Sequence, residues 1–586
     1  MLNRFRTRLA DVDSLPQLAV LGLVSGLLAG GVIILFRLII EHTQSSFLPG
    51  GNAESYEALS TSMHFLLPTV GGLIIGLIFH AFNTAGGGGV QVGIVHVLER
   101  IAYHQSHLPL RNLILQFVGA IISIVSGHSV GREGPGVHLG AASSSLLGQL
   151  FHLPNNSIQT LVACGAAASI AASFNTPIAG VIFAMEVITM EYTIAGFAPI
   201  ILAAVSATAL TRFVFGAEPA FSVPSLQLAS LFELPYLLVM GLVMGSLAAS
   251  FIASLKWITE SSGKIIIWQR MTLAGILTGL CALIVPEVMG VGYDTVNQAM
   301  LGQIGISLLL MVVLFKIIAT TIGLGLGLPG GLIGPTLVIG AAAGGILGHL
   351  AEMFFPGQVA SPGFYAMLGM GAMMAATLQA PLAALLAMLE LTANPNIILP
   401  GMLAVVVSSI TSSHLFGRES VLITLLKARG LDYRSDPVAL SLRRIGVASA
   451  LNPSFVHAPR ELKRVAAETT LTNKPLWIVI DEDDTPKALL LAADLALFLS
   501  SKEASDQQVD TPPSTAEEKI DLLAIPAQRQ DIAEINQQAT LQEALDIMNE
   551  KGVDALCVYI MRRNKNKEII GILTRQNIES HYRGDR

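Results

Sequence analysis

The chain contains 586 residues, of which 52% are hydrophobic and 13% are charged, and its formal net charge is −7 at pH 7. The charges are unevenly distributed, because residues 441–586 carry 40 of them and the first 440 residues only 35. This composition excludes a single soluble enzyme of ordinary make-up and an outer-membrane barrel, whose strands alternate apolar with polar residues. It also excludes nucleic-acid binding, because the chain has no large basic block. We expect a membrane body followed by a soluble tail.

The first residues predict a cytoplasmic N-terminus without a signal peptide. Residues 1–11 carry Arg4, Arg6 and Arg8 but no short apolar run that ends in a cleavage site. Arginines beside a first span are typical of the cytoplasmic side. Apolar segments long enough to cross about 30 Å of hydrocarbon lie near residues 17–40, 64–82, 111–127, 194–214, 234–255, 271–290, 306–326 and 397–416.

Other apolar segments are too short, or too interrupted by glycine and proline, to be simple spanning helices. A helix that ends inside the membrane leaves backbone groups unpaired, and only a protein-lined cavity accommodates them. Many such segments predict a site near the middle of the membrane, as in transporters built from repeats. They are residues 86–98, 133–151, 160–173, 177–190, 331–350, 365–378 and 381–392.

An internal repeat divides the membrane body. The block AASFNTPIAGVIFAME at 171–186 recurs as AATLQAPLAALLAMLE at 375–390, and GREGP at 131–135 is matched by GLIGP at 331–335. Chance similarity of apolar helices explains the shared alanines. It explains less well why Gly-Pro, Pro and Glu recur in both halves at a nearly constant distance along the chain. We infer two related halves, and the sequence alone leaves open whether they are parallel or inverted. The halves are residues 30–215 and 230–425.

From residue 440 onward, helices and strands alternate, which is typical of small α/β modules. A helix over 541–551, for example, precedes strands over 555–559 and 568–573. Residues 501–520 are polar and contain prolines, which indicates a linker. The predicted domains are the body, residues 1–435, and the tail, residues 440–586, with modules over 445–500 and 521–583.

The sharpest motif of the body is GREGP, which places Arg132 and Glu133 inside an apolar stretch. An ionisable group at membrane depth costs at least about 2.5–3.5 kcal/mol, so it should face a cavity or a partner. A helix that begins here would direct unpaired N–H groups and its positive dipole end at an anion. The Glu133 carboxylate would compete with that anion until it is protonated. The alternative interpretation is a structural Arg132–Glu133 pair.

Two further glycine-rich breaks resemble this one. The segment LPGGLIGP at 328–335 has the same Gly/Pro make-up without a charge, and would expose the amides of Leu332 and Ile333. The run at 86–89 opens a helix over 90–98, although a glycine run alone is also compatible with a plain loop.

Four other ionisable residues allow two interpretations each. Glu186 and Glu390 end apolar helices, where they either pack at the helix end or relay a proton or ion. His128 and His138 flank Glu133, where they are either hydrogen-bonded structural groups or members of a relay.

In the tail, Thr574 and Asn577 follow a strand at the start of a helix. They could hydrogen-bond a ribose or phosphate, or they form an ordinary N-cap. Asp494 occupies the equivalent place in the first module, which lacks the hydroxyl.

No pattern of an enzyme or a metal protein occurs. The cysteines, Cys164, Cys281 and Cys557, are widely spaced and odd in number, so we expect buried free thiols and no metal site. We find no hydrolytic triad or phosphate loop and do not expect an enzyme.

Together, these motifs resemble the CLC family of chloride channels and chloride/proton exchangers. GREGP, PGGLIGP and the two blocks that end in glutamate match in order and spacing over about residues 20–430, and the tail resembles a pair of CBS modules, most clearly at 536–582. The resemblance implies an all-α polytopic membrane domain with two inverted repeats of short tilted helices, plus a cytoplasmic α/β CBS pair. It also implies a homodimer with one pore per subunit, bound chloride ions, and an adenine nucleotide as the possible ligand of the CBS pair.

The resemblance assigns roles by motif. Glu133 matches the gating glutamate, which blocks the anion site until it is protonated or displaced. Gly88 stands where many members have serine, and Leu422 where many have tyrosine. The implied anion-binding residues are Gly88, Gly131, Arg132, Gly134, Leu332, Ile333 and Leu422, and Thr574, Asn577 and Asp494 are implied as a weak nucleotide site.

Val187 is the most informative departure from the family pattern. Exchangers typically carry a second, internal glutamate directly after the residue that matches Glu186, and channels commonly have valine there. The proton-pathway candidates are therefore Glu186 and Val187. We predict a passive chloride channel gated by voltage or pH; the alternative is a chloride/proton antiporter with weakened proton coupling.

A third hypothesis is a nucleotide sensor that the membrane part merely anchors, but an anchor needs no glycines at mid-membrane. We expect a multi-pass protein of the lipid membrane, namely the bacterial inner membrane, with both termini in the cytoplasm.

Overall fold

The computed structural model describes residue 9 and residues 15–51, 54–86, 91–192, 194–221, 226–431, 437–482, 485–508, 519–561 and 567–583. The chain forms two compact units. The helical unit comprises Leu15–Phe151 and Ile158–Tyr433, and the tail unit comprises Met1–Ser14, His152–Ser157 and Arg434–Arg586. Each is described by itself below.

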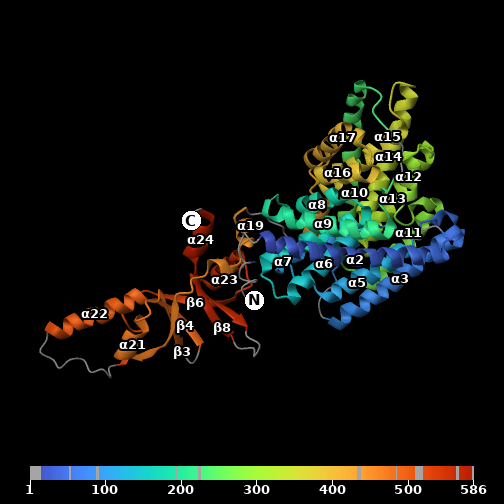
Figure 1. Cartoon of the computed structure of the whole chain (residues 1–586). Coiled ribbons are helices and arrows are strands. Elements are labelled where there is room, and N and C mark those ends of the chain that lie inside the picture. Colours follow the sequence, from blue (N-terminus) through green and yellow to red (C-terminus); the bar gives the residue numbers. More distant parts are fainter. Residues whose placement is uncertain are drawn as a thin grey trace. The chain divides into compact units, whose positions relative to one another are not determined.

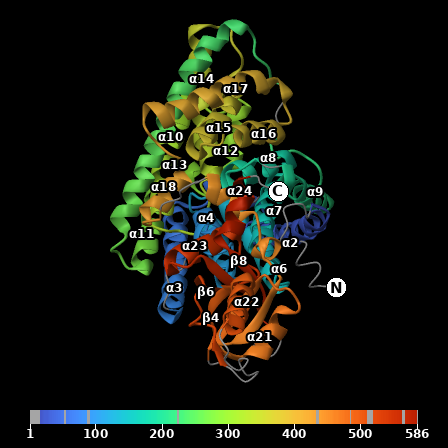
Figure 2. The same ribbon diagram turned by 90° about the vertical axis from the view of Figure 1, so that its left-hand side faces the viewer.

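The helical unit contains two series of helices that correspond one to one. The first series is α2 (Leu15–Phe47), α3 (Thr61–Gly86), α4 (Ile94–Tyr103), α5 (Leu110–Val125), α6 (Glu133–Leu150), α7 (Asn155–Phe174), α8 (Pro177–Phe183) and α9 (Ile194–Phe215). The second is α10 (Leu234–Ser262), α11 (Ile267–Ile284), α12 (Tyr293–Met300), α13 (Ile306–Gly325), α14 (Ile333–Phe354), α15 (Pro362–Leu378), α16 (Pro381–Thr392) and α17 (Ile398–Ile410), followed by α18 (Val421–Ala428). Both views show α2 beside α9, and α15 beside α14 and α17 (Figures 1 and 2).

The two halves meet through reciprocal backbone bonds. Gly131 and Gly331 form an antiparallel bridge, in which each N–H donates to the other carbonyl at 2.7 and 2.8 Å. These glycines occupy equivalent places in the two GxxGP motifs, so the halves run in opposite directions where they touch. The bridge thus relates the two motifs by a local two-fold axis, as expected for a duplicated structure.

Two segments expected to be too broken to span are continuous helices. The expected pieces 160–173 and 331–350 belong to α7 and α14, which have 20 and 22 residues and are apolar enough to cross a membrane. Nine helices meet that criterion among the residues that the structure describes. The glycines do not interrupt α14, because they serve close helix contacts: a Cβ on Gly340 would lie 2.4 Å from the Gly369 carbonyl oxygen of α15.

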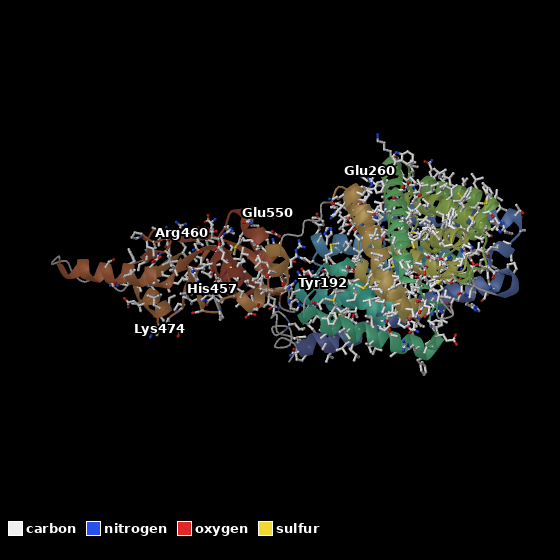
Figure 3. All side chains as sticks on the ribbon, turned by 90° about the horizontal axis from the view of Figure 1, so that it is seen from above. Tyr192, Glu260, His457, Arg460, Lys474 and Glu550 are labelled. Carbon is white, nitrogen blue, oxygen red and sulfur yellow. The ribbon has the colours of Figure 1, made fainter. Side chains whose placement is uncertain are left out.

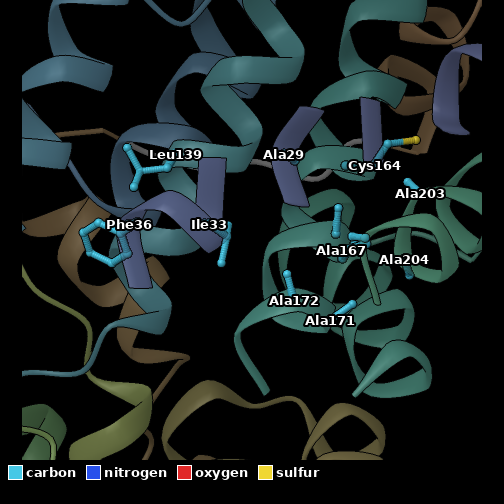
Figure 4. Packing of buried hydrophobic residues seen from close by; sticks show 14 of the residues in the cluster. Ala29, Ile33, Phe36, Leu139, Cys164, Ala167, Ala171, Ala172, Ala203 and Ala204 are labelled. Carbon is cyan, nitrogen blue, oxygen red and sulfur yellow. The ribbon is translucent and has the colours of Figure 1, made fainter. Parts of the chain in front are cut away.

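Small side chains dominate the core of the first half. Ala29 and Ile33 of α2 belong to one buried cluster with Ala167 and Ala171 of α7 (Figure 4). Alanine allows these helices to approach closely without burying polar atoms. On the outer surface, large apolar side chains such as Leu35 of α2 are exposed, which suits contact with lipid rather than water.

The tail unit is built on a six-stranded sheet of order β1-β3-β4-β6-β7-β8. β1 pairs parallel with β3, which pairs antiparallel with β4; β6 pairs parallel with β7, which pairs antiparallel with β8. The antiparallel pair β4–β6 joins these two similar groups of three strands. The elements are β1 (Phe455–Pro459), β2 (Glu461–Lys463), α21 (Arg464–Leu471), β3 (Trp477–Glu482), β4 (Thr485–Leu491), α22 (Ala492–Gln508), β5 (Lys519–Asp521), β6 (Arg529–Asn536), α23 (Leu541–Lys551), β7 (Ala555–Met561), β8 (Lys567–Thr574) and α24 (Arg575–Arg583), preceded by α19 (Pro437–Arg443) and α20 (Val447–Ala450).

The predicted linker 501–520 differs from the structure at both ends. Residues 501–508 continue helix α22, and residues 519–520 belong to β5. Lysine, glutamate and alanine favour helix, so this polar stretch extends α22 without an apolar face. Charged side chains lie on the surface of this unit, including Arg460, Lys474 and Glu550, which are exposed (Figure 3).

Candidate functional site

The candidate site lies where α6 and α14 begin. The Gly131–Gly331 bridge brings together the turns that precede the two helices, so both N-termini converge on one place. Pro135 and Pro335 lie in the first turns, where a missing N–H costs nothing. The first amides of a helix have no partner within the helix, and together with the helix dipole they attract negative charge.

The carboxylate of Glu133 occupies this place. Its side chain is fully buried, at 0% exposure. Oε2 accepts a hydrogen bond from the Gly334 amide at 3.2 Å, and Oε1 accepts one from the Tyr293 hydroxyl. A Cβ on Gly131 would lie only 2.4 Å from Oε2, so glycine is needed for the carboxylate to lie against the backbone.

Tyr293 is a site residue that the sequence analysis missed. It is the first residue of α12, and its ring packs edge-on against Phe221 at 5.6 Å between centroids. The preceding Gly292 has a φ of +85°, as Gly93 before α4 has a φ of +84°. This pair of glycines, 199 residues apart, is the repeat signal that could have identified Tyr293.

Arg132 approaches Glu133 without forming a close pair. Its Nε lies 4.0 Å from Glu133 Oε1, and its Nη1 lies 3.7 Å from Glu41 Oε1. Its guanidinium carbon lies 5.2 Å from the centre of the Tyr293 ring. Arg132 is thus shared among Glu41, Glu133 and Tyr293, and places positive charge beside the carboxylate.

A cavity of about 150 Å³ adjoins the helix ends. Its lining includes three predicted anion-binding residues, Gly134, Leu332 and Leu422, together with the start of α4 at Gly93 and Ile94. Ile333 begins α14 and lines a separate apolar space of about 10 Å³. Gly88 lies outside the residues that the structure describes. The geometry therefore gathers the other predicted anion-binding residues around the two helix ends.

Glu186 caps the start of α16, and Glu390 caps the start of α8. Glu186 accepts hydrogen bonds from the amides of Leu382 and Ala383 at 3.3 and 2.8 Å, and Glu390 accepts them from Ile178 and Ala179 at 3.1 and 2.8 Å. Each glutamate thus binds the first turn of the helix in the opposite half.

Val187 and the two predicted histidines are buried. Val187 lies in the π-helical turn Ala184–Thr189. His128 Nδ1 contacts the Ser126 hydroxyl at 2.9 Å, and His138 Nε2 contacts His96 Nδ1 at 2.9 Å. Both histidines are thus buried and hydrogen-bonded.

The predicted nucleotide residues do not form one cluster. Thr574 and Asn577 hydrogen-bond each other, with 2.6 Å between Oγ1 and Oδ1, as in an N-cap. Asp494 follows β4, whereas Thr574 ends β8, three strands away in the sheet order. At about 4.8 Å per strand step, β4 and β8 themselves are separated by roughly 14 Å.

The three cysteines are free thiols in the structure. All three cysteines are buried and free, and burial raises the pKa of the Cys557 thiol in the tail to about 12. Within the described ranges, no group of three or more His, Cys, Asp or Glu residues could hold a metal ion.

Comparison with known proteins identifies two families. The family described as "Voltage gated chloride channel" matches residues 71–413, and the CBS domain family matches residues 527–584. A ClcB-like protein of Ralstonia nicotianae is 33% identical over 422 residues, which cover 69% of this chain and 95% of that protein. The chloride channel protein CLC-f of Arabidopsis thaliana is 27% identical over 89% of this chain and 74% of its own length. The H(+)/Cl(-) exchange transporter ClcA of Vibrio cholerae is 31% identical over 50% of this chain and 64% of its own length.

Solved structures share the fold. A slow cyanobacterial Cl-/H+ antiporter superposes with a TM-score of 0.61 at 24% identity, over 72% of this chain and 98% of its own. A eukaryotic CLC transporter superposes with a TM-score of 0.61 at 19% identity, over 96% of this chain and 97% of its own. These findings confirm the predicted fold class, a helical membrane domain of two inverted repeats with an α/β tail. The chain belongs to the CLC family of voltage-gated chloride channels and carries a C-terminal CBS domain.

Proposed function

We propose that this protein is a chloride channel in which Glu133 is the gate. The observation that carries the proposal is the position of the Glu133 carboxylate on the Gly334 amide, where two helix N-termini would otherwise receive an anion. A carboxylate and a chloride ion bear the same charge and accept the same hydrogen bonds. The Glu133 carboxylate therefore occupies the anion site in place of a chloride ion.

Opening requires the carboxylate to leave this place. Protonation removes its charge, after which the helix dipoles and amides favour an incoming chloride over the neutral acid. Gly131, Gly134, Leu332 and Ile333 surround the vacated position, and Arg132 keeps a positive charge beside it. Backbone amides hold the ion weakly enough for it to leave again.

The absence of a carboxylate at position 187 supports a channel over an exchanger. Valine cannot carry a proton, and the neighbouring Glu186 already binds two amides of α16. The alternative, an exchanger with weakened proton coupling, is supported by the similarity to the ClcA exchange transporter. In that case Glu186 or water would have to carry the proton.

Flux measurements on the full chain in lipid vesicles test the proposal. With a chloride gradient imposed, we expect chloride to move without stoichiometric proton movement in the opposite direction. Uphill proton pumping at a fixed ratio would refute the channel and favour the exchanger. We expect Glu133→Gln to raise chloride flux at neutral pH and to abolish its pH dependence. Unchanged flux and pH dependence would show that Glu133 is not the gate.

The remaining assignments follow from family membership. We propose a homodimer with one pore per subunit, in the bacterial inner membrane, with both termini in the cytoplasm, and transport rather than enzymatic catalysis. We also propose that residues 445–500 form a first CBS module beside the matched second one. Because Thr574 and Asn577 already bond each other, we expect weak or absent binding of adenine nucleotides.

A further inference from the structure

The short helix α12, which carries Tyr293, is held at two points by residues from other parts of the chain. Lys316 of α13 donates hydrogen bonds to the carbonyl oxygens of Val288 and Gly290, both at 3.0 Å, in the turn that precedes α12. Glu54, in the loop between α2 and α3, accepts a hydrogen bond from the Tyr293 amide at 3.1 Å. The start of α12 is thus fixed through carbonyls by one residue and through its first amide by another.

Lys316 is a fully buried charge, at 0% exposure, in a helix apolar enough to cross a membrane. An ammonium group in such a place is costly unless hydrogen bonds and opposite charges compensate for its lost hydration. The carboxylates of Asp294, Glu54 and Glu57 attract it electrostatically. Its two bonds to carbonyl oxygens are charge-assisted, and such bonds are stronger than those between neutral groups.

The first half of the chain lacks this arrangement. The two GxxGP motifs are 200 residues apart, which makes Gln116 the counterpart of Lys316. Gln116 is also fully buried, but neither polar atom of its amide has a hydrogen-bond partner in the described part of the chain. Helix α4, the counterpart of α12, begins with the apolar Ile94. The charged residue therefore occurs only in the half whose short helix presents a tyrosine to Glu133.

The backbone is constrained at the same two points. Glu54 has a φ of +77°, a conformation that is unfavourable for residues with a side chain and persists where surrounding contacts fix it. Gly292, directly before Tyr293, has a φ of +85°, and a Cβ there would lie 3.1 Å from Lys316 Nζ. A helix of eight residues has little stability of its own, so the place of Tyr293 depends on these contacts.

We propose that Glu54 and Lys316 are positioning residues of the gate, which fix the first turn of α12 so that the Tyr293 hydroxyl stays on the Glu133 carboxylate. The inference rests on the proposed function, in which Glu133 is the gate. Hydrogen bonds weaken steeply when their geometry is lost. Loss of either positioning residue should therefore open the gate more readily, as loss of the hydroxyl itself would.

Substitutions that remove opposite charges separate positioning from a direct electrostatic effect. Lys316→Met removes a positive charge and Glu54→Ala a negative one, so an electrostatic influence on Glu133 alone would change chloride flux in opposite directions. Positioning predicts that both variants of the full chain, in lipid vesicles at pH 7, raise the flux by about threefold or more. Lys316→Arg and Glu54→Gln keep a donor and an acceptor and should stay near the wild type. Opposite changes in flux would overturn the inference.

Other charged groups face the same turn, namely Arg132 before α6, Asp294 in α12, and Glu57 and Glu287 in the adjoining loops. Burial and, after it, the Asp294 carboxylate raise the pKa of Glu57 to about 8. The Glu57–Asp294 pair therefore keeps a proton between pH 5 and pH 7. A change in the pH profile of the flux over that range reports Glu133 rather than this pair.

The Tyr293→Phe background tests whether the two positioning residues act through the hydroxyl. In that background, Lys316→Met and Glu54→Ala should change the flux and its pH profile little further, whereas additive effects would place their action elsewhere and refute the inference. Thr321→Val is the matched control, because Thr321 is also buried in α13 but its hydroxyl bonds only to carbonyls of that helix. It should behave as the wild type in both backgrounds.

Crystal structures of the variants provide a readout that does not depend on transport. In Lys316→Met and Glu54→Ala, the Tyr293 hydroxyl should lie beyond hydrogen-bonding distance of Glu133, about 3.5 Å. If it moves away while the flux stays at the wild-type level, the positioning stands and the gate role of Glu133 is wrong. If it keeps its place in both variants, the inference is wrong and the channel stands. Thermal unfolding identifies a variant that fails to fold, and Lys316→Gln then replaces Lys316→Met, because glutamine is the residue of the first half.

Discussion

At the scale of single residues, the state of the gate depends on what holds one carboxylate. Glu133 accepts hydrogen bonds from an amide at the start of α14 and from the Tyr293 hydroxyl, while Arg132 lies 4.0 Å away. A hydrogen bond to a charged group contributes about 1.5–3 kcal/mol. Tyr293 therefore contributes to keeping the carboxylate in the place of the anion.

Tyr293→Phe should loosen the gate. The substitution keeps the ring packed against Phe221 and removes only the hydroxyl. Loss of roughly 1.5 kcal/mol corresponds to about a tenfold larger open fraction, so chloride flux at neutral pH should rise. The flux should also depend less on pH, because the carboxylate leaves more readily without a proton. Chloride efflux from vesicles between pH 5 and pH 8 measures both effects.

Tyr365→Phe is the matched control for this variant. Tyr365 donates to Glu233 Oε2 at 2.5 Å in a buried Tyr–Glu pair that lines neither described cavity. We expect it to lower stability without changing the pH profile of the flux. A Tyr293→Phe protein with the flux and pH profile of the wild type would show that the hydroxyl does not hold the gate.

The sequence predicted the gate but not the residue that holds it. Glu133 stands out because a charge in an apolar, glycine-flanked segment has few explanations. Tyr293 belongs to a helix of eight residues whose partner in the first half begins with isoleucine, so the glycine before each helix is repeated but the tyrosine itself is not. Lys316 is also a charge within an apolar segment, but no glycine or proline flanks it. Only the tertiary structure brings it to the start of α12.

At the scale of helices, glycines allow neighbouring helices to approach closely and do not interrupt the helices that contain them. In the first half, a Cβ on Gly165 of α7 would lie 2.1 Å from the Gly140 carbonyl oxygen of α6. In the second half, a Cβ on Gly344 of α14 would lie 2.2 Å from the Tyr365 carbonyl oxygen of α15. The pairs α6–α7 and α14–α15 thus pack backbone to backbone in both halves. From the sequence such glycines are expected to interrupt helices, because composition alone does not show whether another helix lies against them.

Gly344→Ala should therefore destabilise the protein, although alanine is the better helix former. The added methyl group has no room at the Tyr365 carbonyl, and overpacking of this kind costs about 1–3 kcal/mol. Gly31→Ala in α2 is the control, because no atom lies within 4 Å of its Cβ position. It should leave stability unchanged or raise it by up to about 1 kcal/mol. Thermal unfolding in detergent compares the two variants, and equal stability of both would refute the packing argument.

At the scale of the whole molecule, duplication accounts for the position of the site. The repeat could be read from the sequence, since the two blocks that end in Glu186 and Glu390 keep their prolines and glutamates in register. Its inverted sense could not, because the apolar residues of a helix look the same whichever way it crosses the membrane. The Gly131–Gly331 bridge places the two helix N-termini at one point.

The same symmetry gives Glu186 and Glu390 equivalent tasks. Each carboxylate binds two amides in the first turn of a helix in the other half, where the helix dipole also favours negative charge. A cap of this kind contributes about 0.5–2 kcal/mol. The predicted proton pathway, in contrast, singles out Glu186, because Val187 beside it is the position at which an exchanger would carry its glutamate.

Glu186→Gln and Glu390→Gln therefore separate the two interpretations. If both residues are caps, each substitution should lower the free energy of unfolding by a similar amount, roughly 0.5–2 kcal/mol, because glutamine keeps the shape but loses the charge that the helix dipole favours. Chloride flux per folded protein should then stay near that of the wild type in both. If Glu186 relays protons, its variant alone should lose proton movement coupled to chloride, while Glu390→Gln keeps it. Parallel measurements of unfolding, chloride flux and proton flux on the two variants decide between a symmetric structural pair and a single functional carboxylate.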